Sequence, residues 1–194
     1  MTGILTTALT GFFLLSSSTG TFSGGGLLQT PSAPESEPEL VATKTLSVSM
    51  TGYNAVPEQT DNDPFTTASG AYSNPEIIAA RSVDLADELP FGTVIQISQP
   101  NASSTCGFGL VEEFVGLRVI ADVMHERMRN KIDVLFDTES TVRAGGKNMN
   151  PARALGLCRG IQIDVVGHID IAHIPQTQEE LRAAVGKAVL KVNK

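Results

Sequence analysis

Three aspartates beside hydrophobic segments are the residues of this sequence best suited to proton transfer. Asp122 ends the segment VIADV, Asp133 lies within IDVLF, and Asp84 follows an apolar segment in RSVDL. A carboxyl group beside apolar surface and a second carboxylate keeps its proton to higher pH, because burial and like charge both disfavour ionisation. Such a group can serve as a general acid near neutral pH. The alternative is that these aspartates cap turns and strand ends, which is the commoner role of Asp.

The orientation of Asp133 follows from the pattern of its segment. In a strand, successive side chains alternate between two faces. Ile132, Val134 and Phe136 would then share one face, and Asp133 and Leu135 the other. Asp133 is therefore expected to project away from the larger apolar side chains.

Most of the chain after residue 44 has the pattern of short strands. Apolar residues that alternate with polar ones, or form short runs between turn residues, predict strands. With few helical segments between them, six such strands predict a mainly β fold, either a small closed barrel or a sandwich. The predicted strands are Thr45–Tyr53, Ile77–Val83, Thr93–Ser98, Leu117–Val123, Ile132–Phe136 and Ile161–His168.

Two helices are expected in the second half of the chain. Asn150 as N-cap and Pro151 at the first helical position predict a short helix over Ala152–Leu157. Thr177 and Glu180 have the spacing of a capping box, which predicts the start of a C-terminal helix. The residues that follow have apolar side chains at helical spacing, so this helix is expected to be amphipathic.

The chain is expected to have three parts. Residues 1–28 contain an apolar run of signal-peptide length, Ile4–Leu15, and are interpreted as an export signal or membrane anchor. The alternative is a disordered apolar start. Residues 29–44, rich in Pro, Ser and Glu, are predicted to be a disordered linker. The folded domain is expected over residues 45–194, placed outside the cytoplasm as a secreted or membrane-anchored protein.

The charge of the chain argues against nucleic acid as a partner. The formal net charge is −7 and no basic stripe is present, whereas phosphate neutralisation needs clustered Lys and Arg. The two cysteines, Cys106 and Cys158, allow one disulfide or two buried thiols.

A metal site near the last predicted strand is the weakest of the candidate sites. His168, Asp170 and His173 cluster there, but their spacing matches no familiar ligand motif. Surface-loop histidines are the favoured interpretation, and no metal or cofactor is expected.

Several ordered blocks of the chain resemble the 3D domain family, which is named for three aspartates. The blocks are TGYNAVPEQTDNDPFTTASG, IIAARSVDLADELPFGTVIQI and VIADVMHERMRNKIDVLFD. That family is similar to the catalytic region of MltA-type lytic transglycosylases and to stationary-phase muralytic proteins of spore-forming bacteria. The resemblance extends from about Leu46 to Ile169. It implies a six-stranded double-psi β-barrel, in agreement with the strand count.

The resemblance also assigns roles to the three aspartates. The aspartates of its blocks fall on Asp84, Asp122 and Asp133, and the last occupies the position of the general acid/base in the transglycosylases. Asp84 and Asp122 would then orient Asp133 and raise its proton affinity.

A substrate groove beside the aspartates is implied as well. Thr67, Ser69 and Gly70, in the long polar loop between the first two strands, would line it. His125 is a further candidate, since it lies between two of the aspartates in the chain. The chain departs from the family pattern where Met124 and His125 replace a Gly-Gly pair, and in inserts around residues 99–115 and 144–150.

The resemblance implies cleavage of peptidoglycan. The expected reaction breaks the β-1,4 bond between N-acetylmuramic acid (MurNAc) and N-acetylglucosamine (GlcNAc) and leaves a 1,6-anhydro product, with one aspartate as acid and base. The alternative is a barrel that binds cell-wall glycan without cleaving it. Absence of Trp and an aromatic content of 5% argue mildly against pure sugar binding.

Overall fold

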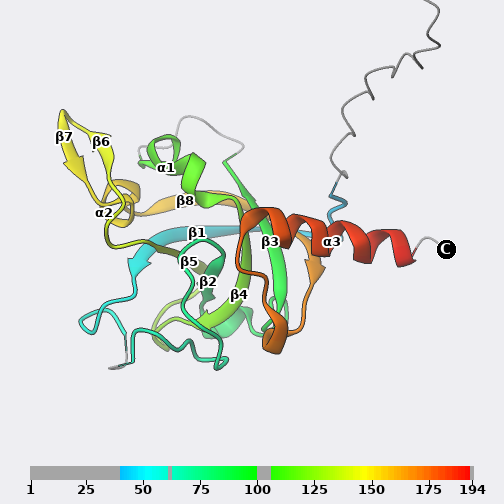
Figure 1. The fold of residues 1–194 in the computed structure, drawn as a ribbon. Helices are drawn as coiled ribbons and strands as arrows, with labels where there is room; N and C mark the ends of the chain where they lie inside the picture. Colours follow the sequence, from blue (N-terminus) through cyan, green and yellow to red (C-terminus); the bar gives the residue numbers. More distant parts are fainter. Residues whose placement is uncertain (1–39, 61–62, 100–105, 193–194) are drawn as a thin grey trace, which may run out of the picture. The chain divides into compact units, whose positions relative to one another are not determined.

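The computed structural model of the chain describes residues 40–60, 63–99 and 106–192, in which six strands close into a barrel (Figure 1). The strands are β1 (Lys44–Asn54), β2 (Ile78–Arg81), β3 (Thr93–Ser98), β4 (Leu117–Val123), β5 (Lys131–Phe136) and β8 (Cys158–His168). Each predicted strand is present, so the expectation of a mainly β, six-stranded barrel is confirmed.

Neighbouring strands of the barrel are seldom neighbours in the chain. Their order is β1, β5, β2, β4, β3 and β8. The pairs β1–β5 and β2–β4 are parallel, and the other neighbours are antiparallel. Because a tight turn cannot join parallel strands, the barrel needs long connections. The connections β1–β2 and β4–β5 are the ones that carry the candidate site.

The strands separate their apolar side chains onto two faces, as the alternation predicts. Ile132, Val134 and Phe136 of β5 lie in the main core with Val48 and Met50 of β1. Leu135 lies on the opposite face, in a second cluster with residues of β2, β3, β4, β8 and a C-terminal helix. Asp133 belongs to the same face of β5 as Leu135.

The C-terminal helix α3 (Gln178–Val192) covers part of this second face (Figure 1). Leu181 and Val185 are buried there, and Val185 lies close against Gly167 of β8, where a Cβ atom would come within 3.0 Å. The predicted capping box forms only in part. The Glu180 N–H donates to Thr177 Oγ1 at 3.2 Å, but the Glu180 carboxylate accepts from the Gln176 N–H instead of Thr177.

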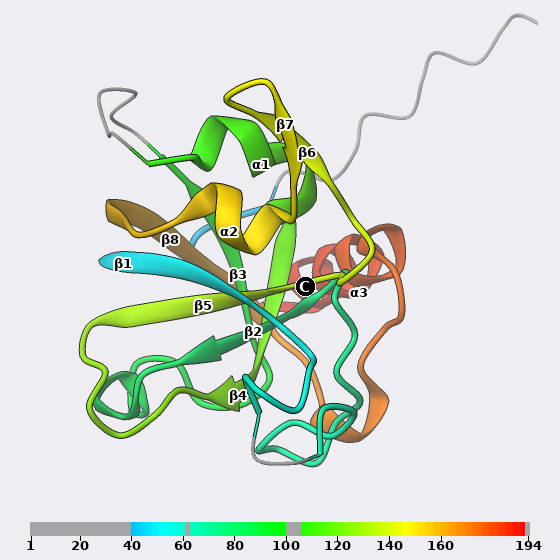
Figure 2. The same cartoon turned by 90° about the vertical axis from the view of Figure 1, so that its left-hand side faces the viewer.

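The remaining elements gather at one end of the barrel (Figure 2). They are α1 (Phe108–Val115), α2 (Pro151–Leu155) and the hairpin of β6 (Val142–Ala144) with β7 (Lys147–Met149). Asn150 caps α2 through its side chain, as predicted. Helix α1 and the hairpin lie at the two segments, around residues 99–115 and 144–150, for which the sequence predicted only inserts relative to the family it resembles. Short 3-10 turns follow β2 (Val83–Leu85) and β8 (Ile171–His173).

A disulfide ties this end together. Cys106 and Cys158 are joined with an S–S distance of 2.05 Å, which links the segment before α1 to the start of β8.

The predicted N-terminal segments lie mostly outside the described residues. This holds for residues 1–28 and for residues 29–39 of the predicted linker. The end of that linker is already attached to the barrel, because the N–H of Thr43 donates to the Val165 carbonyl at 2.8 Å. Within the part of the chain that the structure describes, no helix is both long and apolar enough to cross a membrane.

Candidate functional site

Asp122 and Asp133 lie in one row across three neighbouring strands. Ala80 of β2 is the register partner of Asp122 on β4 and also of Asp133 on β5. Thr51 of β1 pairs with Asp133 on its other side. Since neighbouring strands are about 4.8 Å apart, the two aspartate backbones are separated by roughly 10 Å. The small side chain of Ala80 leaves the space between the two carboxyl groups open.

A bulge in β4 places Asp122 in this row. The register of β2 against β4 shifts between Ala79, which pairs with Ile120, and Ala80, which pairs with Asp122. Ala121 is thus the extra residue. Without it, strict alternation would put Asp122 on the face of Ile120, inside the barrel core. The bulge turns the carboxylate to the face that carries Asp133.

Asp122 is held by three donors. Its Oδ1 accepts hydrogen bonds from the N–H groups of Ala68 and Val123, both at 2.9 Å. Its Oδ2 accepts one from the hydroxyl of Tyr53 at 3.0 Å. Hydrogen bonds of this kind stabilise the ionised form of a carboxylate. Asp122 is therefore arranged as a fixed negative charge.

Asp133 has the opposite environment. Its Oδ1 atom is buried, and among the described residues it has no hydrogen-bond partner. Burial raises the pKa of Asp133 to about 7, and the negative charge of Asp122 raises it as well, although Thr51 and the charge of Lys131 oppose the change. A large fraction of Asp133 is therefore protonated near neutral pH, as a general acid must be.

A continuous cleft contains both carboxyl groups. Two adjoining hollows share the walls formed by Tyr53, Gln59, Asp122 and the segment 123–125. The inner hollow continues over Ala80 to Asp133. The outer hollow continues toward the β1–β2 connection, and its further lining residues are Glu58, Thr60, Thr66, Ala68 and Ser73. Most of these side chains are hydroxyls, amides or carboxylates, which suit a ligand rich in hydrogen-bonding groups.

The three loop residues expected to line the groove lie behind its wall. Thr67 is buried, and its Oγ1 contacts Ser69 Oγ at 3.0 Å and donates to the Ala71 carbonyl at 3.1 Å. Ser69 N–H donates to the carbonyl of Ala121, the bulge residue, and Gly70 has a φ of +84°. These residues shape the turn that presents the Ala68 N–H to Asp122. They support the site without lining either hollow.

Asp84 is not brought to the other two aspartates. It is exposed, and its Oδ2 accepts a hydrogen bond from the Asn130 N–H at 2.9 Å. The Ser82 side chain and this backbone bond lower the pKa of Asp84. Asn130 has a φ of +47°, so it forms a tight turn before β5. Asp84 therefore anchors the end of the β4–β5 connection instead of orienting Asp133 directly.

His125 lies at the cleft. It is exposed and lines both hollows, and its Nδ1 accepts a hydrogen bond from the Arg127 N–H at 3.2 Å. Met124 lines both hollows beside it. Met124 and His125 therefore form one wall of the cleft.

Tyr53 is among the residues of the site that the sequence did not single out. Alternation in β1 puts it on the face of Thr51, yet this does not reveal its partner, because Asp122 lies on a strand that does not pair with β1. Only the closed barrel brings the two together.

The candidate metal positions line neither hollow of this cleft. Within the described ranges no group of three His, Cys, Asp or Glu side chains could hold a metal ion. His173 pairs with Asp170 at 2.9 Å, both exposed, while His168 contacts the Phe91 carbonyl.

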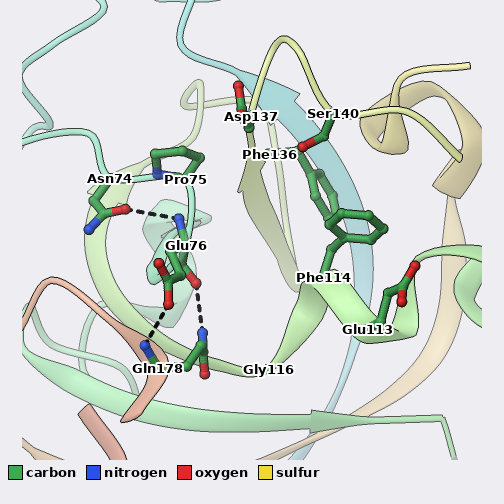
Figure 3. Close-up of a pocket in the computed structure, with 10 residues that line it drawn as sticks. All are labelled: Asn74, Pro75, Glu76, Glu113, Phe114, Gly116, Phe136, Asp137, Ser140 and Gln178. Atoms are coloured by element: carbon green, nitrogen blue, oxygen red, sulfur yellow. Dashed lines mark hydrogen bonds between the residues drawn. The ribbon is translucent and has the colours of Figure 1, made fainter. Parts of the chain in front are cut away.

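A separate hollow lies between α1, β5 and the start of α3 (Figure 3). Phe114 and Phe136 form one wall, and the Glu76 carboxylate accepts from the Gln178 N–H at 2.8 Å. The Glu76 side chain thus binds the first residue of α3. Neither Asp122 nor Asp133 lines this hollow.

No protein-family model matches the chain, and no curated protein gives a significant match.

Proposed function

We propose that the protein is a lytic transglycosylase of peptidoglycan, with Asp133 as its general acid and base. The observation that carries the proposal is Asp133 itself, which lines the cleft beside a carboxylate held by three donors, and whose buried Oδ1 has no hydrogen-bond partner among the residues that the structure describes. An unsatisfied buried polar atom of this kind calls for a partner, and a substrate oxygen would supply it.

The proposed reaction needs one proton carrier. Asp133 donates its proton to the glycosidic oxygen while the bond from that oxygen to C1 of MurNAc breaks, and the bonding electrons leave with the GlcNAc oxygen. Positive charge develops at C1, as in other glycoside cleavages. The C6 hydroxyl oxygen of MurNAc then bonds to C1 and returns its proton to Asp133. The product is a 1,6-anhydro ring, and no water is consumed.

Asp122 contributes by its charge. It lies across Ala80 from Asp133 and is held by Tyr53, Ala68 and Val123. A fixed negative charge stabilises the developing positive charge at C1 and favours the protonated form of Asp133. A hydrolytic mechanism would instead ask the second carboxylate to activate water or attack C1. Three existing hydrogen bonds leave Asp122 less free to do either.

The strand arrangement supports the double-psi assignment within the barrel. Two parallel pairs, β1–β5 and β2–β4, are formed by strands that are not consecutive in the chain, and β5 and β2 adjoin each other. Such crossed connections are what a double-psi barrel requires. They also explain why the loops after β1 and β4 meet at one cleft.

The proposed place of action is outside the cytoplasm, at the cell wall. A disulfide between Cys106 and Cys158 suits an oxidising compartment. The apolar segment in residues 1–28 would export the protein or anchor it to the membrane. Peptidoglycan glycan strands are the proposed partner, and the net charge of −7 disfavours nucleic acid.

The second candidate is a barrel that binds peptidoglycan without cleaving it. One observation favours it: Met124 and His125, which stand where the 3D family has a Gly-Gly pair, add side chains to a wall of both hollows. A narrower cleft could hold a glycan strand without admitting the distorted ring that cleavage needs.

Digestion of purified sacculi followed by mass spectrometry distinguishes these proposals. The wild-type protein should release 1,6-anhydro muropeptides, and Asp133→Asn should release none. Asp87→Asn is the matched control, because it makes the same change at an exposed aspartate outside both hollows. Reducing ends in place of anhydro ends would indicate hydrolysis. Binding of the wild type without any product would favour the second candidate.

A further inference from the structure

Tyr53 joins the two halves of the cleft. Its side chain lines both hollows, and its hydroxyl donates to Asp122 Oδ2 at 3.0 Å. In β1 it lies two residues beyond Thr51, the register partner of Asp133, and it pairs with Leu135 on the same face of β5. The phenol therefore approaches Asp122 from the strand that also borders Asp133.

The other donors to Asp122 act on a different oxygen. The N–H groups of Ala68 and Val123 both bond to Oδ1, so Tyr53 is the one donor to Oδ2 among the described residues. Burial raises the pKa of the Tyr53 phenol, and the charge and hydrogen bond of Asp122 raise it further. The phenol thus stays protonated over the whole pH range in which the carboxyl groups titrate, and it remains a donor.

We infer that Tyr53 is a positioning residue, whose hydroxyl keeps Asp122 as the ionised member of the pair so that the shared proton resides on Asp133. The inference on protonation stands on the geometry of the pair, and its consequence for catalysis rests on the proposed function. Burial favours the protonated form of Asp133 and the charge of Asp122 favours it as well, so a hydrogen bond to the Asp122 carboxylate acts in the same direction.

Other charged groups that face Asp122 and Asp133 do not favour the ionised form of Asp122 in the same way. Lys131 of β5 lowers the pKa of Asp133 and so acts against protonation there. Arg118, buried in β4, acts on the Tyr53 phenol and lowers its pKa, against the larger effect of burial. His125 and Glu58 line the cleft from the loops after β4 and β1. None of these four groups has a hydrogen bond to Asp122 comparable with that of Tyr53.

The test is the pair Tyr53→Phe and Tyr72→Phe. The chain has two tyrosines, and Tyr72 is 61% exposed and lines neither hollow, so its variant makes the same chemical change outside the cleft. Carboxyl ¹³C shifts of Asp122 and Asp133 are followed from pH 3 to 9 in the full chain. In wild type and Tyr72→Phe, the last proton should leave from Asp133. In Tyr53→Phe, Asp122 should take up its proton at a higher pH than in wild type.

Activity on sacculi gives a second readout. A hydrogen bond to a charged group contributes about 1.5–3 kcal/mol, so its loss should move the acid limb of the pH–rate profile upward by about one pH unit. At pH values below that limb, the turnover rate of Tyr53→Phe should be about tenfold lower than that of wild type. The basic limb and the KM should change little.

The outcomes separate the two proposals. If Tyr53→Phe titrates like wild type at both carboxyl groups, Tyr53 has no positioning role and the inference is wrong. If it shifts the proton while the wild type releases no anhydro product, the inference holds and the proposed function fails. If the NMR spectrum of Tyr53→Phe shows that the barrel has not folded, the variant is replaced by Tyr53→Trp. The indole N–H of Trp restores a donor and should retain the wild-type distribution of the proton.

Discussion

Asp122 and Asp133 flank Ala80 in register, one on each neighbouring strand of β2. This relationship depends on the bulge at Ala121 and on the small side chain between the carboxyl groups. It gives two chemically identical residues different surroundings: Asp122 has three donors, whereas a buried oxygen of Asp133 has no partner within the described part of the chain. Different environments for a pair of titratable groups are the usual basis for assigning an acid and a fixed charge.

The first prediction concerns the space over Ala80. Ala80→Leu should fill the inner hollow between the two carboxyl groups, because Ala80 lines it and is 3% exposed. The expected result is loss of anhydro product by at least about tenfold and a loss of stability of about 1–3 kcal/mol, typical of overpacking. Ala79→Val, on the core face, is the control for stability. An Ala80→Leu protein with full activity would place the reaction elsewhere.

The second prediction is a pH dependence of stability due to Asp133. Its folded pKa, about 7, lies above the ordinary value of 3.8, so between these values the folded state binds more protons than the unfolded state. Stability from this group is complete below about pH 4 and falls as pH rises through 7.

Asp133→Asn removes the loss of stability that ionisation of the buried Asp133 causes. Its free energy of unfolding should exceed that of wild type by about 4 kcal/mol at pH 8, and the difference should vanish near pH 4. Urea unfolding at the two pH values measures it. Equal differences at both would show that Asp133 titrates normally in the folded protein.

The third prediction is that Asp84 stabilises the β4–β5 connection and takes no part in proton transfer by Asp133. Asp84→Asn should still release anhydro product, with a turnover rate lowered only several-fold, whereas hydrogen exchange of the Asn130 amide should rise because its acceptor is weakened. Because the pKa of Asp84 is lowered in the folded state, its contribution is present above its ordinary pKa and is lost at more acid pH. If Asp84→Asn is completely inactive while hydrogen exchange of the Asn130 amide is unchanged, Asp84 takes part in catalysis and this prediction is wrong.

The sequence predicts the scaffold of this site better than its chemistry. Alternation over short segments identifies all six strands, since side chains of opposite polarity must face core and solvent, and it places Asp133 correctly opposite Ile132. It cannot place Asp122, because the bulge at Ala121 depends on pairing with β2. The hydrogen bond from Tyr53 escapes it for a similar reason, since the closed barrel brings together two strands that do not pair.

A helix at the end of the barrel and the role of Asp84 also escape local reasoning. Helix α1 has eight residues between Gly107 and Gly116, too short to be recognised by periodicity, and its stability comes from packing. Gly107 is needed there because a Cβ atom would come within 1.9 Å of the Ala154 carbonyl oxygen. The role of Asp84 is equally non-local, because its partner Asn130 is 46 residues further along the chain.

The last prediction concerns the disulfide between Cys106 and Cys158. The bond joins residues 52 positions apart and ties the segment before α1 to β8. Closing a loop of this length restricts the unfolded chain, and a stabilisation of roughly 2–4 kcal/mol is expected. Cys106→Ser with Cys158→Ser should therefore lower the midpoint of urea unfolding, and reductant should lower that of wild type but not of the double variant. Since neither cysteine lines the cleft, the folded double variant should keep its activity on sacculi at low temperature. A double variant as stable as oxidised wild type would mean that the barrel holds this end without the covalent link.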